Sequence, residues 1–270
     1  MKFTKMHGIG NDFVVLDKRF DDTNNYEELA KSICHRRFSI GADGMLLVKE
    51  SEIADIKMSY YNADGSLASM CGNGIRCFTK YIYENNIVKK EKITVETLDG
   101  IKTINIDIKN QKYRVDMGLG SYNPSEIPVS TDKEIFINEK ITILDKTYNI
   151  HAVLMGVPHL VIVVDQIDKE ETIKYGEILE THDIFPKNIN VNFAQIVDKN
   201  TVKVSTWERG CGYTLGCGTG MSAVAMVLNK LGHTNNVVSV ESEGGKVEIE
   251  ITDSVYMIGP AVKICEGEIY

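Results

Sequence analysis

Two cysteine–glycine stretches hold the residue types in this sequence that are best suited to chemistry. Cys71-Gly72-Asn73-Gly74 precedes an apolar run with helical periodicity, and Cys217-Gly218-Thr219-Gly220 precedes another. The two cysteines lie 217 − 71 = 146 residues apart in a chain of 270. The first backbone N–H groups of a helix lack an intrahelical partner, and the helix dipole adds partial positive charge there. Each stretch therefore predicts a thiol beside an anion site that suits a carboxylate.

The presence of two such stretches suggests proton transfer on both faces of one carbon. The field of a helix N-terminus lowers the pKa of a nearby thiol, so we expect thiolate to be accessible near neutral pH. With a substrate carboxylate between two helix ends, one thiolate removes the α-proton and the opposite thiol delivers a proton to the other face. The helix ends stabilise the charge that spreads onto the carboxylate. This stereoinversion requires neither a cofactor nor a metal, and the cysteines show no metal-ligand spacing.

Other interpretations of the paired motif stay open. A single Cys-Gly-x-Gly is more often structural than catalytic, and it is the duplication that favours catalysis. The alternatives are a structural disulfide between Cys71 and Cys217, a non-catalytic module that binds amino-acid carboxylates, and a thiol redox protein. The remaining cysteines lack the glycine setting, and we interpret them as structural: Cys34, Cys77, Cys211 and Cys265.

The elements that must position these motifs can be read from periodicity and turn residues. Helices are expected over residues 24–38, with Asn24 or Asn25 as the cap, after Cys71 as far as Asn85-Asn86, and after Cys217 as far as Gly232. Turns are expected at residues 8–11, 62–65 and 99–100. The segments expected to be strands in the first half are residues 2–6, 12–17, 45–49, 56–61, 93–97, 101–108 and 112–117.

The second half of the chain repeats the first. Residues 8–17 align with 156–165 at an offset of 148. Residues 61–64 align with 207–210 and 71–74 with 217–220, both at 146, and 95–100 align with 240–245 at 145. Four matches in the same order predict a duplicated domain with a cleft between the copies.

The fold class expected from this pattern is α/β (α+β), with two pseudo-symmetric domains. Each domain is pictured as a curved mixed sheet wrapped around a central helix, because the helix after each Cys-Gly-x-Gly is apolar enough to be largely buried. We place residues 1–117 plus 262–270 in the half that carries Cys71, and residues 118–261 in the half that carries Cys217. The final strand is expected to return to the first domain.

Bulk composition limits the classes of function. The hydrophobic fraction of 43% and charged fraction of 25% are typical of a soluble globular protein. A net charge of −8 argues against nucleic acid as a partner. The apolar runs are far shorter than the roughly 20 residues that span a bilayer, and the start has no apolar signal core, so we expect a cytoplasmic protein without membrane contact. Its cysteines are then expected to be free thiols.

The whole chain closely resembles the diaminopimelate epimerases, which invert the α-carbon of LL-diaminopimelate without PLP. The resemblance implies two pseudo-symmetric α/β domains, an amino-acid substrate, no cofactor and a homodimer. It rests on a series of motifs in addition to the two cysteine stretches: Lys5-Met6-His7-Gly8-Ile9-Gly10-Asn11-Asp12-Phe13, Gly41-Ala42-Asp43-Gly44, Asn62-Ala63-Asp64-Gly65-Ser66, Met155-Gly156-Val157-Pro158-His159, Asn190-Val191-Asn192-Phe193, Glu208-Arg209-Gly210 and Gly259-Pro260-Ala261.

The resemblance also implies roles for individual residues. Cys71 and Cys217 match the two catalytic thiols, with His159 near one of them and Glu208 near the other; either neighbour is a candidate for generating thiolate. The residues that match the helix ends holding the reacting carboxylate are Gly72, Asn73, Gly74, Gly218 and Thr219. Those that match substrate contacts are Asn62 and Glu208 for amines, Asn190 and Arg209 for the distal end, and Asn11.

Two departures bear on the substrate. Val157 replaces an Asn that contributes to binding of the distal carboxylate, and Tyr213 stands where many members have Glu or another residue. Relatives with the same thiols racemise other amino acids, among them histidine, and proline racemase-like enzymes share the two-cysteine logic. Arg209 fits a bidentate clasp on a second carboxylate, which favours diaminopimelate. We also expect the two thiols to oxidise to a disulfide when the site is empty, with loss of activity.

Overall fold

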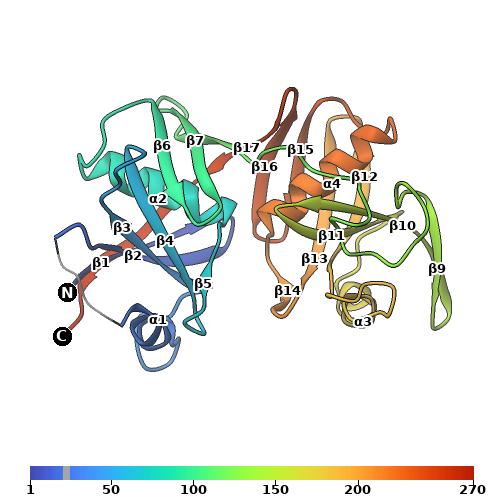
Figure 1. Ribbon diagram of the computed structural model, residues 1–270, viewed down its shortest axis with the longest axis horizontal. Coiled ribbons are helices and arrows are strands. Elements are labelled where there is room, and N and C mark those ends of the chain that lie inside the picture. Colours follow the sequence, from blue (N-terminus) through green and yellow to red (C-terminus); the bar gives the residue numbers. More distant parts are fainter. Residues whose placement is uncertain (21–24) are drawn as a thin grey trace. The chain divides into compact units, whose positions relative to one another are not determined.

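The computed structural model describes residues 1–20 and 25–270 and divides into two compact units (Figure 1). Unit 1 consists of residues 1–116 together with 258–270, and unit 2 consists of residues 117–257. The chain passes between them twice, after residue 116 and again within one strand, β17 (Val255–Pro260). In the described ranges, no helix is both long and apolar enough to cross a membrane.

Unit 1 is a mixed sheet with two helices. Its sheet runs in the order β18, β1, β2, β3, β4, and β4 then pairs with both β5 and β6 before the sheet continues through β7 to β8. The pairings β2–β3 and β4–β6 are parallel and the others in this order are antiparallel. The elements are β1 (Lys2–Gly8), β2 (Asn11–Asp17), α1 (Tyr26–Cys34), β3 (Gly44–Lys49), β4 (Ile56–Asn62), β5 (Leu67–Ala68), α2 (Gly72–Glu84), β6 (Lys92–Thr97), β7 (Gly100–Asp107), β8 (Lys112–Asp116) and β18 (Val262–Glu268).

Unit 2 repeats this pairing scheme. Its sheet runs in the order β9, β10, β11, β12, β13, and β13 pairs with both β14 and β15 before the sheet continues to β16. The parallel pairings β11–β12 and β13–β15 occupy the places of β2–β3 and β4–β6. The elements are β9 (Glu139–Ile143), β10 (Lys146–Met155), β11 (Val157–Val164), α3 (Lys169–Glu180), β12 (Asn190–Asp198), β13 (Thr201–Glu208), β14 (Gly212–Thr214), α4 (Gly218–Lys230), β15 (Val237–Ser242) and β16 (Gly245–Ile251).

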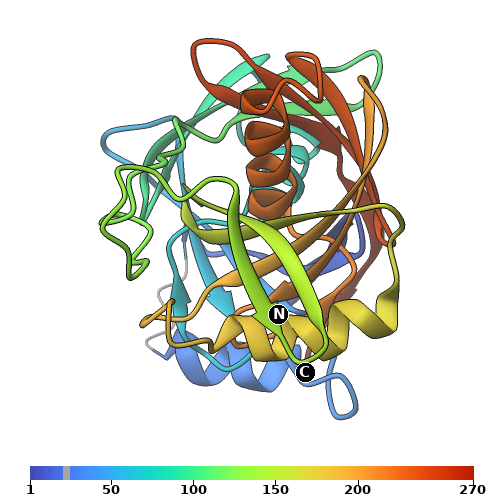
Figure 2. The same ribbon diagram turned by 90° about the vertical axis from the view of Figure 1, so that its right-hand side faces the viewer.

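Each unit encloses the helix that follows its Cys-Gly-x-Gly. Helix α2 packs on β1 to β4 and β8, and α4 packs on β10 to β13, β15 and β16. In Figure 2 the strands of unit 2 surround α4, the dark orange helix. Both helices bury ten residues along most of their length. Those of α4 are small or apolar and cover more than one face, whereas those of α2 include Arg76, Thr79 and Lys80. The expected fold, a mixed sheet wrapped around a central helix in each half, is confirmed.

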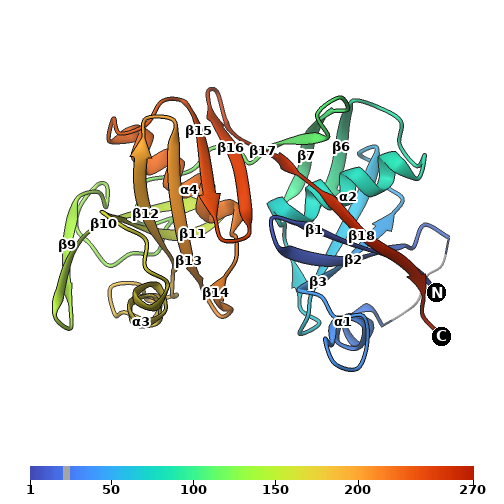
Figure 3. The same cartoon turned by 180° about the vertical axis from the view of Figure 1, so that it is seen from behind.

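The equivalent strands β1 and β10 each have a neighbour that comes from a different part of the chain. In unit 2, β9 lies antiparallel to β10 and directly precedes it. In unit 1 the same place beside β1 is taken by β18, the last strand of the protein (Figure 3). The N-terminal amine also donates to the Ile269 carbonyl oxygen, at 2.6 Å. The start of the chain is therefore held by its end.

Helix α1 is shorter than the sequence pattern predicts. The expected range was residues 24–38; Asn24 lies outside the described residues, and Asn25 caps the helix by accepting from the Glu28 N–H at 3.1 Å. The helix ends at Cys34 rather than Phe38. Its last carbonyls, on Ile33 and Cys34, accept from the N–H groups of residues 41 and 42, so the following chain folds back on the helix end instead of extending it.

The hairpins correct one part of the expected sequence alignment. Gly8 pairs with Asn11 across a two-residue turn, whereas Met155 pairs with Val157 across a single residue. In the next pair of strands, Phe13 pairs with Gly44 in unit 1 and His159 pairs with Asn190 in unit 2. The equivalent residues of the two units are therefore 146 positions apart on both strands, since 159 − 13 and 190 − 44 are both 146. The offset is therefore 146 rather than 148 along β2 and β11. Asn11 corresponds to Val157, and His159 corresponds to Phe13.

Candidate functional site

Both candidate thiols are the N-cap residues of the enclosed helices. The Cys71 Sγ accepts from the Gly74 N–H at 3.5 Å, and the Cys217 Sγ accepts from the Gly220 N–H at 3.4 Å. This position is usually filled by Ser, Thr, Asp or Asn, whose oxygen satisfies a free N–H of the first turn. A neutral thiol is a weak acceptor, and the same bond becomes charge-assisted when sulfur ionises. The cap therefore favours thiolate at each position.

An asparagine held by a carboxylate faces the Cys71 thiol. The Asn11 Nδ2 donates to Asp43 at 2.7 Å, and the Asn11 Oδ1 lies 3.5 Å from the Cys71 Sγ. Because a carboxylate only accepts, the amide orientation is fixed and Oδ1 receives the S–H of the thiol. The Asp43 carboxylate is itself held by Arg36 at 2.6 Å.

The residues beneath Asn11 form an ion cluster. Arg36 and Lys5 both contact the carboxylate of Asp12, at 2.7 and 2.8 Å. Burial alone would raise the pKa of Asp12, but hydrogen bonds from these two cations hold it at about 2. The cluster therefore stays charged at neutral pH and anchors the start of β2, from which Asn11 projects.

Arg76 braces the first turn of α2 and was missed by the sequence analysis. It is fully buried and donates to the Gly72 carbonyl at 3.0 Å, to the Asn73 Oδ1 at 2.8 Å and to the Pro260 carbonyl at 3.1 Å. Burial lowers its pKa to about 10, so it remains a cation at neutral pH. The Asn73 Oδ1 is thereby held within the first turn of α2. An arginine within an apolar helical run is the sequence signal that points to this role.

Asn62 lies at the end of β4, in the turn that precedes α2. Its Nδ2 donates to the Ser66 Oγ at 2.9 Å, and its backbone N–H donates to the Ser66 carbonyl. Ser66 in turn donates to Asp64 at 2.6 Å. The turn is therefore internally hydrogen-bonded and holds the Asn62 amide in a fixed orientation.

The Cys217 thiol sits in a more enclosed setting. Its Sγ lies 3.4 Å from the Thr219 Oγ1, and Glu208, at the end of β13, accepts from the Thr214 hydroxyl at 2.6 Å. Burial raises the pKa of Cys217 well above its ordinary value, and the negative charge of Glu208 raises it further. The N-cap bond from Gly220 lowers the pKa of this thiol as expected, but burial and the neighbouring carboxylate outweigh it, so the expected net lowering is wrong for unit 2.

Asn190 and Arg209 are joined in unit 2. The Asn190 Oδ1 accepts from the Arg209 N–H at 3.0 Å, and its Nδ2 donates to the Pro158 carbonyl at 2.8 Å. The Arg209 Nη1 donates to the Lys187 carbonyl at 3.0 Å, near the surface. Both ends of the Asn190 amide are used within the protein, so this residue positions the backbone of Arg209.

His159 is fully buried on β11. Its Nδ1 lies 3.2 Å from the Asn192 Nδ2, and its Nε2 has no hydrogen-bond partner among the described residues. Burial, and to a smaller extent the charge of Arg209, lower the pKa of His159 to about 3. The imidazole is therefore neutral throughout the physiological range.

The side chains on which the first turn of each enclosed helix packs, its floor, differ between the units. In unit 1 the Gly74 backbone lies against the apolar side chains of Phe13 and Leu46. At the matching positions of unit 2, 146 residues later, stand His159 and Asn192. The Asn192 Oδ1 accepts from the Thr206 hydroxyl at 3.1 Å. The pairing of His159 with Asn192 was not predicted from the sequence and becomes visible only when the halves are aligned in the register of the sheets.

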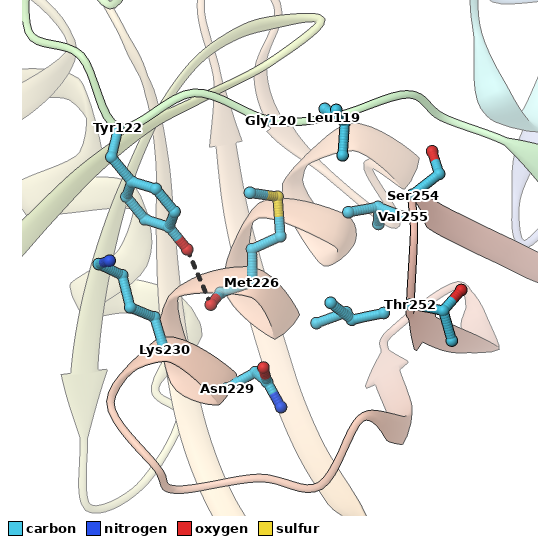
Figure 4. Close-up of a pocket in the computed structure, with 10 residues that line it drawn as sticks. Leu119, Gly120, Tyr122, Met226, Asn229, Lys230, Thr252, Ser254 and Val255 are labelled. Carbon is cyan, nitrogen blue, oxygen red and sulfur yellow. Dashed lines mark hydrogen bonds between the residues drawn. The ribbon is translucent and has the colours of Figure 1, made fainter.

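A separate cavity of about 250 Å³ lies within unit 2, at the other end of α4 (Figure 4). Met226 in its wall is 226 − 217 = 9 residues beyond the cysteine, about 14 Å along the helix. Tyr122 crosses the cavity edge and donates to the Met226 carbonyl at 2.9 Å. None of the residues that line it is a candidate for the thiol chemistry. Within the described part of the chain, no group of His, Cys, Asp or Glu side chains is placed to hold a metal ion.

Comparison with known proteins places the whole chain in one family. The family model described as diaminopimelate epimerase matches residues 3–122 and 151–264. A diaminopimelate epimerase from Alkaliphilus metalliredigens is 49% identical over 99% of this chain and 96% of its own length. One from Clostridium perfringens is 46% identical, over 99% and 98%, and one from Methanococcus maripaludis is 43% identical, over 100% and 99%.

Solved structures share the fold at low sequence identity. A PhzF-family phenazine biosynthesis protein from Bacillus anthracis matches with a TM-score of 0.75 at 15% identity, covering 100% of this chain and 99% of that one. A probable proline racemase from Agrobacterium radiobacter matches with a TM-score of 0.73 at 16% identity, covering 100% and 92%. The fold is thus the one shared by these proteins, and by sequence the chain is an isomerase that belongs to the diaminopimelate epimerase family.

Proposed function

We propose that this protein interconverts LL- and meso-diaminopimelate by proton transfer at the α-carbon without PLP or any other cofactor. The observation that carries the proposal is the pair of thiols at equivalent N-cap positions of α2 and α4. Each stands beside the free N–H groups of a helix start, which suit a carboxylate. The family membership and the names of its relatives favour diaminopimelate among amino acids.

In the proposed reaction, Cys71 and Cys217 act on opposite faces of the α-carbon. The thiolate of one takes the α-proton and becomes a thiol, and the thiol of the other gives its proton to the carbanion and becomes a thiolate. The backbone of Gly72 to Gly74 and of Gly218 and Thr219 stabilises the carboxylate as it gains charge. Arg209 clasps the distal carboxylate, and Asn62 and Glu208 hold amines. We further propose a homodimer located in the cytoplasm.

The charge on Glu208 links the pKa of the Cys217 thiol to substrate binding. In the empty site this carboxylate raises the pKa of the Cys217 thiol. A substrate ammonium bound to Glu208 neutralises that charge, so the thiol pKa falls when substrate arrives. We therefore propose that Cys217 is a protonated thiol before binding and loses its proton more easily afterwards.

The test is exchange of the α-proton of LL- or meso-diaminopimelate in deuterated water, with no PLP added. We expect exchange with the wild-type protein and a loss of about 10²–10⁴-fold for either Cys71→Ser or Cys217→Ser, the range associated with general acid–base catalysis. Binding of diaminopimelate with no exchange at all would instead support a module that only binds amino acids.

A second candidate function is racemisation of another amino acid, such as histidine. The observation that favours it is Val157, which occupies in unit 2 the position that Asn11 holds in unit 1, at 157 − 11 = 146. An apolar side chain cannot donate to a distal carboxylate. The same exchange assay with a panel of amino acids separates the candidates, because exchange with another amino acid and none with diaminopimelate would select the racemase.

A further inference from the structure

The polar floor of unit 2 fixes the orientation of one buried amide. The Asn192 side chain is fully buried, and one of its terminal atoms lies 3.0 Å from the Leu160 carbonyl oxygen. A carbonyl only accepts, so the atom that faces it is the NH₂ group. The opposite atom, Oδ1, accepts from the Thr206 hydroxyl at 3.1 Å. The carbonyl fixes the orientation, and the hydroxyl, which can donate, is compatible with it.

This orientation determines which nitrogen of His159 carries the proton. The Asn192 NH₂ lies 3.2 Å from the His159 Nδ1. Because this neighbour can only donate, the Nδ1 must accept and is unprotonated. The imidazole is neutral, since its burial strongly disfavours the charged form. The one remaining proton is therefore on Nε2, the atom that has no partner among the described residues.

We propose that Asn192 is a positioning residue that locks His159 in its Nε2–H tautomer, so that the imidazole offers the site a hydrogen-bond donor to an anion and does not act as a base. The anion is of the class present in the proposed reaction, a thiolate or a carboxylate, and this role rests on the proposed function. The assignment of the tautomer does not depend on the proposed function, because it follows from the hydrogen bonds of Asn192. A donor of this kind stabilises a thiolate once formed, whereas removal of the thiol proton falls to another group.

The surroundings show that this arrangement is specific to unit 2. A Cβ atom added at Gly220 would lie 2.3 Å from the Asn192 Oδ1, so the first turn of α4 approaches the amide as closely as glycine permits. In unit 1 the residue that corresponds to Asn192 is Leu46, and a Cβ atom added at Gly74 would lie 3.4 Å from its Cδ2, an ordinary contact distance. The first turns of the two enclosed helices thus pack on residues of opposite character, a buried amide in unit 2 and a leucine in unit 1.

The tautomer can be tested by ¹⁵N NMR of histidine side chains, in the full-length protein and without substrate. His151 is an internal reference, because its Nδ1 accepts from the backbone N–H of Asn138 at 3.1 Å and its tautomer is therefore fixed as Nε2–H. We expect His159 to show the same pattern as His151 at neutral pH, with a protonated Nε2 and an unprotonated Nδ1. A protonated Nδ1 on His159 would overturn the proposal.

Substitution of the amide should move the His159 signals alone. Asn192→Asp places an acceptor beside Nδ1, so we expect the proton to shift to Nδ1 while the His151 signals stay unchanged. Asn192→Leu provides a second variant, because leucine is accommodated at the matching position of unit 1; it should leave His159 as a mixture of tautomers. An unchanged His159 pattern in a folded variant would contradict the role of Asn192.

Activity variants of His159 separate a donor from a base. Glutamine can place an amide NH₂ near the position of Nε2, whereas leucine cannot donate. We expect His159→Gln to retain at least about tenfold more proton-exchange activity than His159→Leu, the ratio expected for a hydrogen bond to a charged group. Equal loss in both variants, with the tautomer confirmed by NMR, would refute the donor role while leaving the proposed epimerase reaction intact.

Discussion

At the residue scale, the Cys217 thiol is subject to two opposed effects. The N-cap bond from Gly220 favours thiolate, and burial together with Glu208 favours the neutral thiol. Burial and Glu208 together shift the thiol pKa more than the N-cap bond does, because desolvation of a charge in an enclosed site costs more free energy than one N–H···S bond provides. The substrate-free thiol is therefore protonated at neutral pH.

Removal of the Glu208 charge should make Cys217 more acidic. Because the carboxylate raises the thiol pKa, Glu208→Gln should shift the pH dependence of Cys217 alkylation by iodoacetamide to lower pH. The rates are best followed by mass spectrometry of the peptide that contains Cys217. Glu243→Gln is the matched control, since Glu243 is an exposed carboxylate of the same unit bound to Lys169. A shift of equal size in both variants would argue against a local effect of Glu208.

Two buried histidines make unit 2 sensitive to acid. Burial lowers the pKa of His151 to about 4 and that of His159 to about 3, from an ordinary value of 6.5. Below pH 6.5 the unfolded chain takes up protons that the folded state does not, so the free energy of unfolding falls as pH falls. Between pH 6.5 and pH 5 the expected loss is about 2 kcal/mol for each histidine.

Denaturant unfolding at pH 7 and pH 5 tests this expectation. The variant His151→Asn keeps an acceptor for the Asn138 N–H but cannot be protonated, so it should lose less stability between the two pH values than the wild type, by about 2 kcal/mol. Unfolding of unit 2 can be followed through Trp207, the single tryptophan of the chain. Parallel losses in the two proteins would show that His151 does not account for the acid sensitivity.

At the element scale, the two enclosed helices differ in the space available for a side chain at their third residue, which is glycine in both. A Cβ atom at Gly220 would lie 2.3 Å from the Asn192 Oδ1, whereas one at Gly74 would meet its nearest neighbours at 3.4 Å. We expect Gly220→Ala to lower the free energy of unfolding by about 1–3 kcal/mol through overpacking. Gly74→Ala should change it by less than about 1 kcal/mol. Denaturant midpoints of the two variants provide the comparison, and equal midpoints would contradict the difference in packing.

The elements with strong local signals could be predicted from sequence. The Cys-Gly-x-Gly motifs set the starts of α2 and α4 correctly, and Gly232, with a φ of 77°, follows the end of α4 as expected. The end of α1 could not be predicted, because it depends on hydrogen bonds from residues 41 and 42. The offset of 148 also failed, since a single-residue turn at Gly156 replaces a two-residue turn and nothing in the local sequence reports that change.

Properties of the site that depend on burial could not be predicted from the sequence. The raised pKa of Cys217, the partners of His159 and the brace provided by Arg76 all arise from side chains that the fold brings together. Asn192 lies within a quoted motif, yet its function depends on the register of β11 with β12. The types of the reacting residues could thus be predicted, and the charges on them could not.

At the scale of the whole molecule, β18 closes a sheet that begins more than 250 residues earlier. Deletion of residues 262–270 removes one of the two neighbours of β1, the one that pairs with residues 2–7. We expect amide hydrogen exchange to become faster in residues 1–116 and to change little in residues 117–257, because unit 2 has β9 in the equivalent place. Removal of Tyr270 alone is the control. Uniformly faster exchange in both units would contradict the separate closure of the two sheets.

The position of β18 has a consequence for how the protein is made. A ribosome completes residues 117–257 before it reaches the strand that finishes unit 1, so the half that is synthesised first is completed last. At about 5–20 residues per second, the 270 − 116 = 154 residues after unit 1's main segment take about 8–30 s to emerge. During that interval the edge of β1 is exposed to other chains, and nascent protein is most at risk of mispairing there.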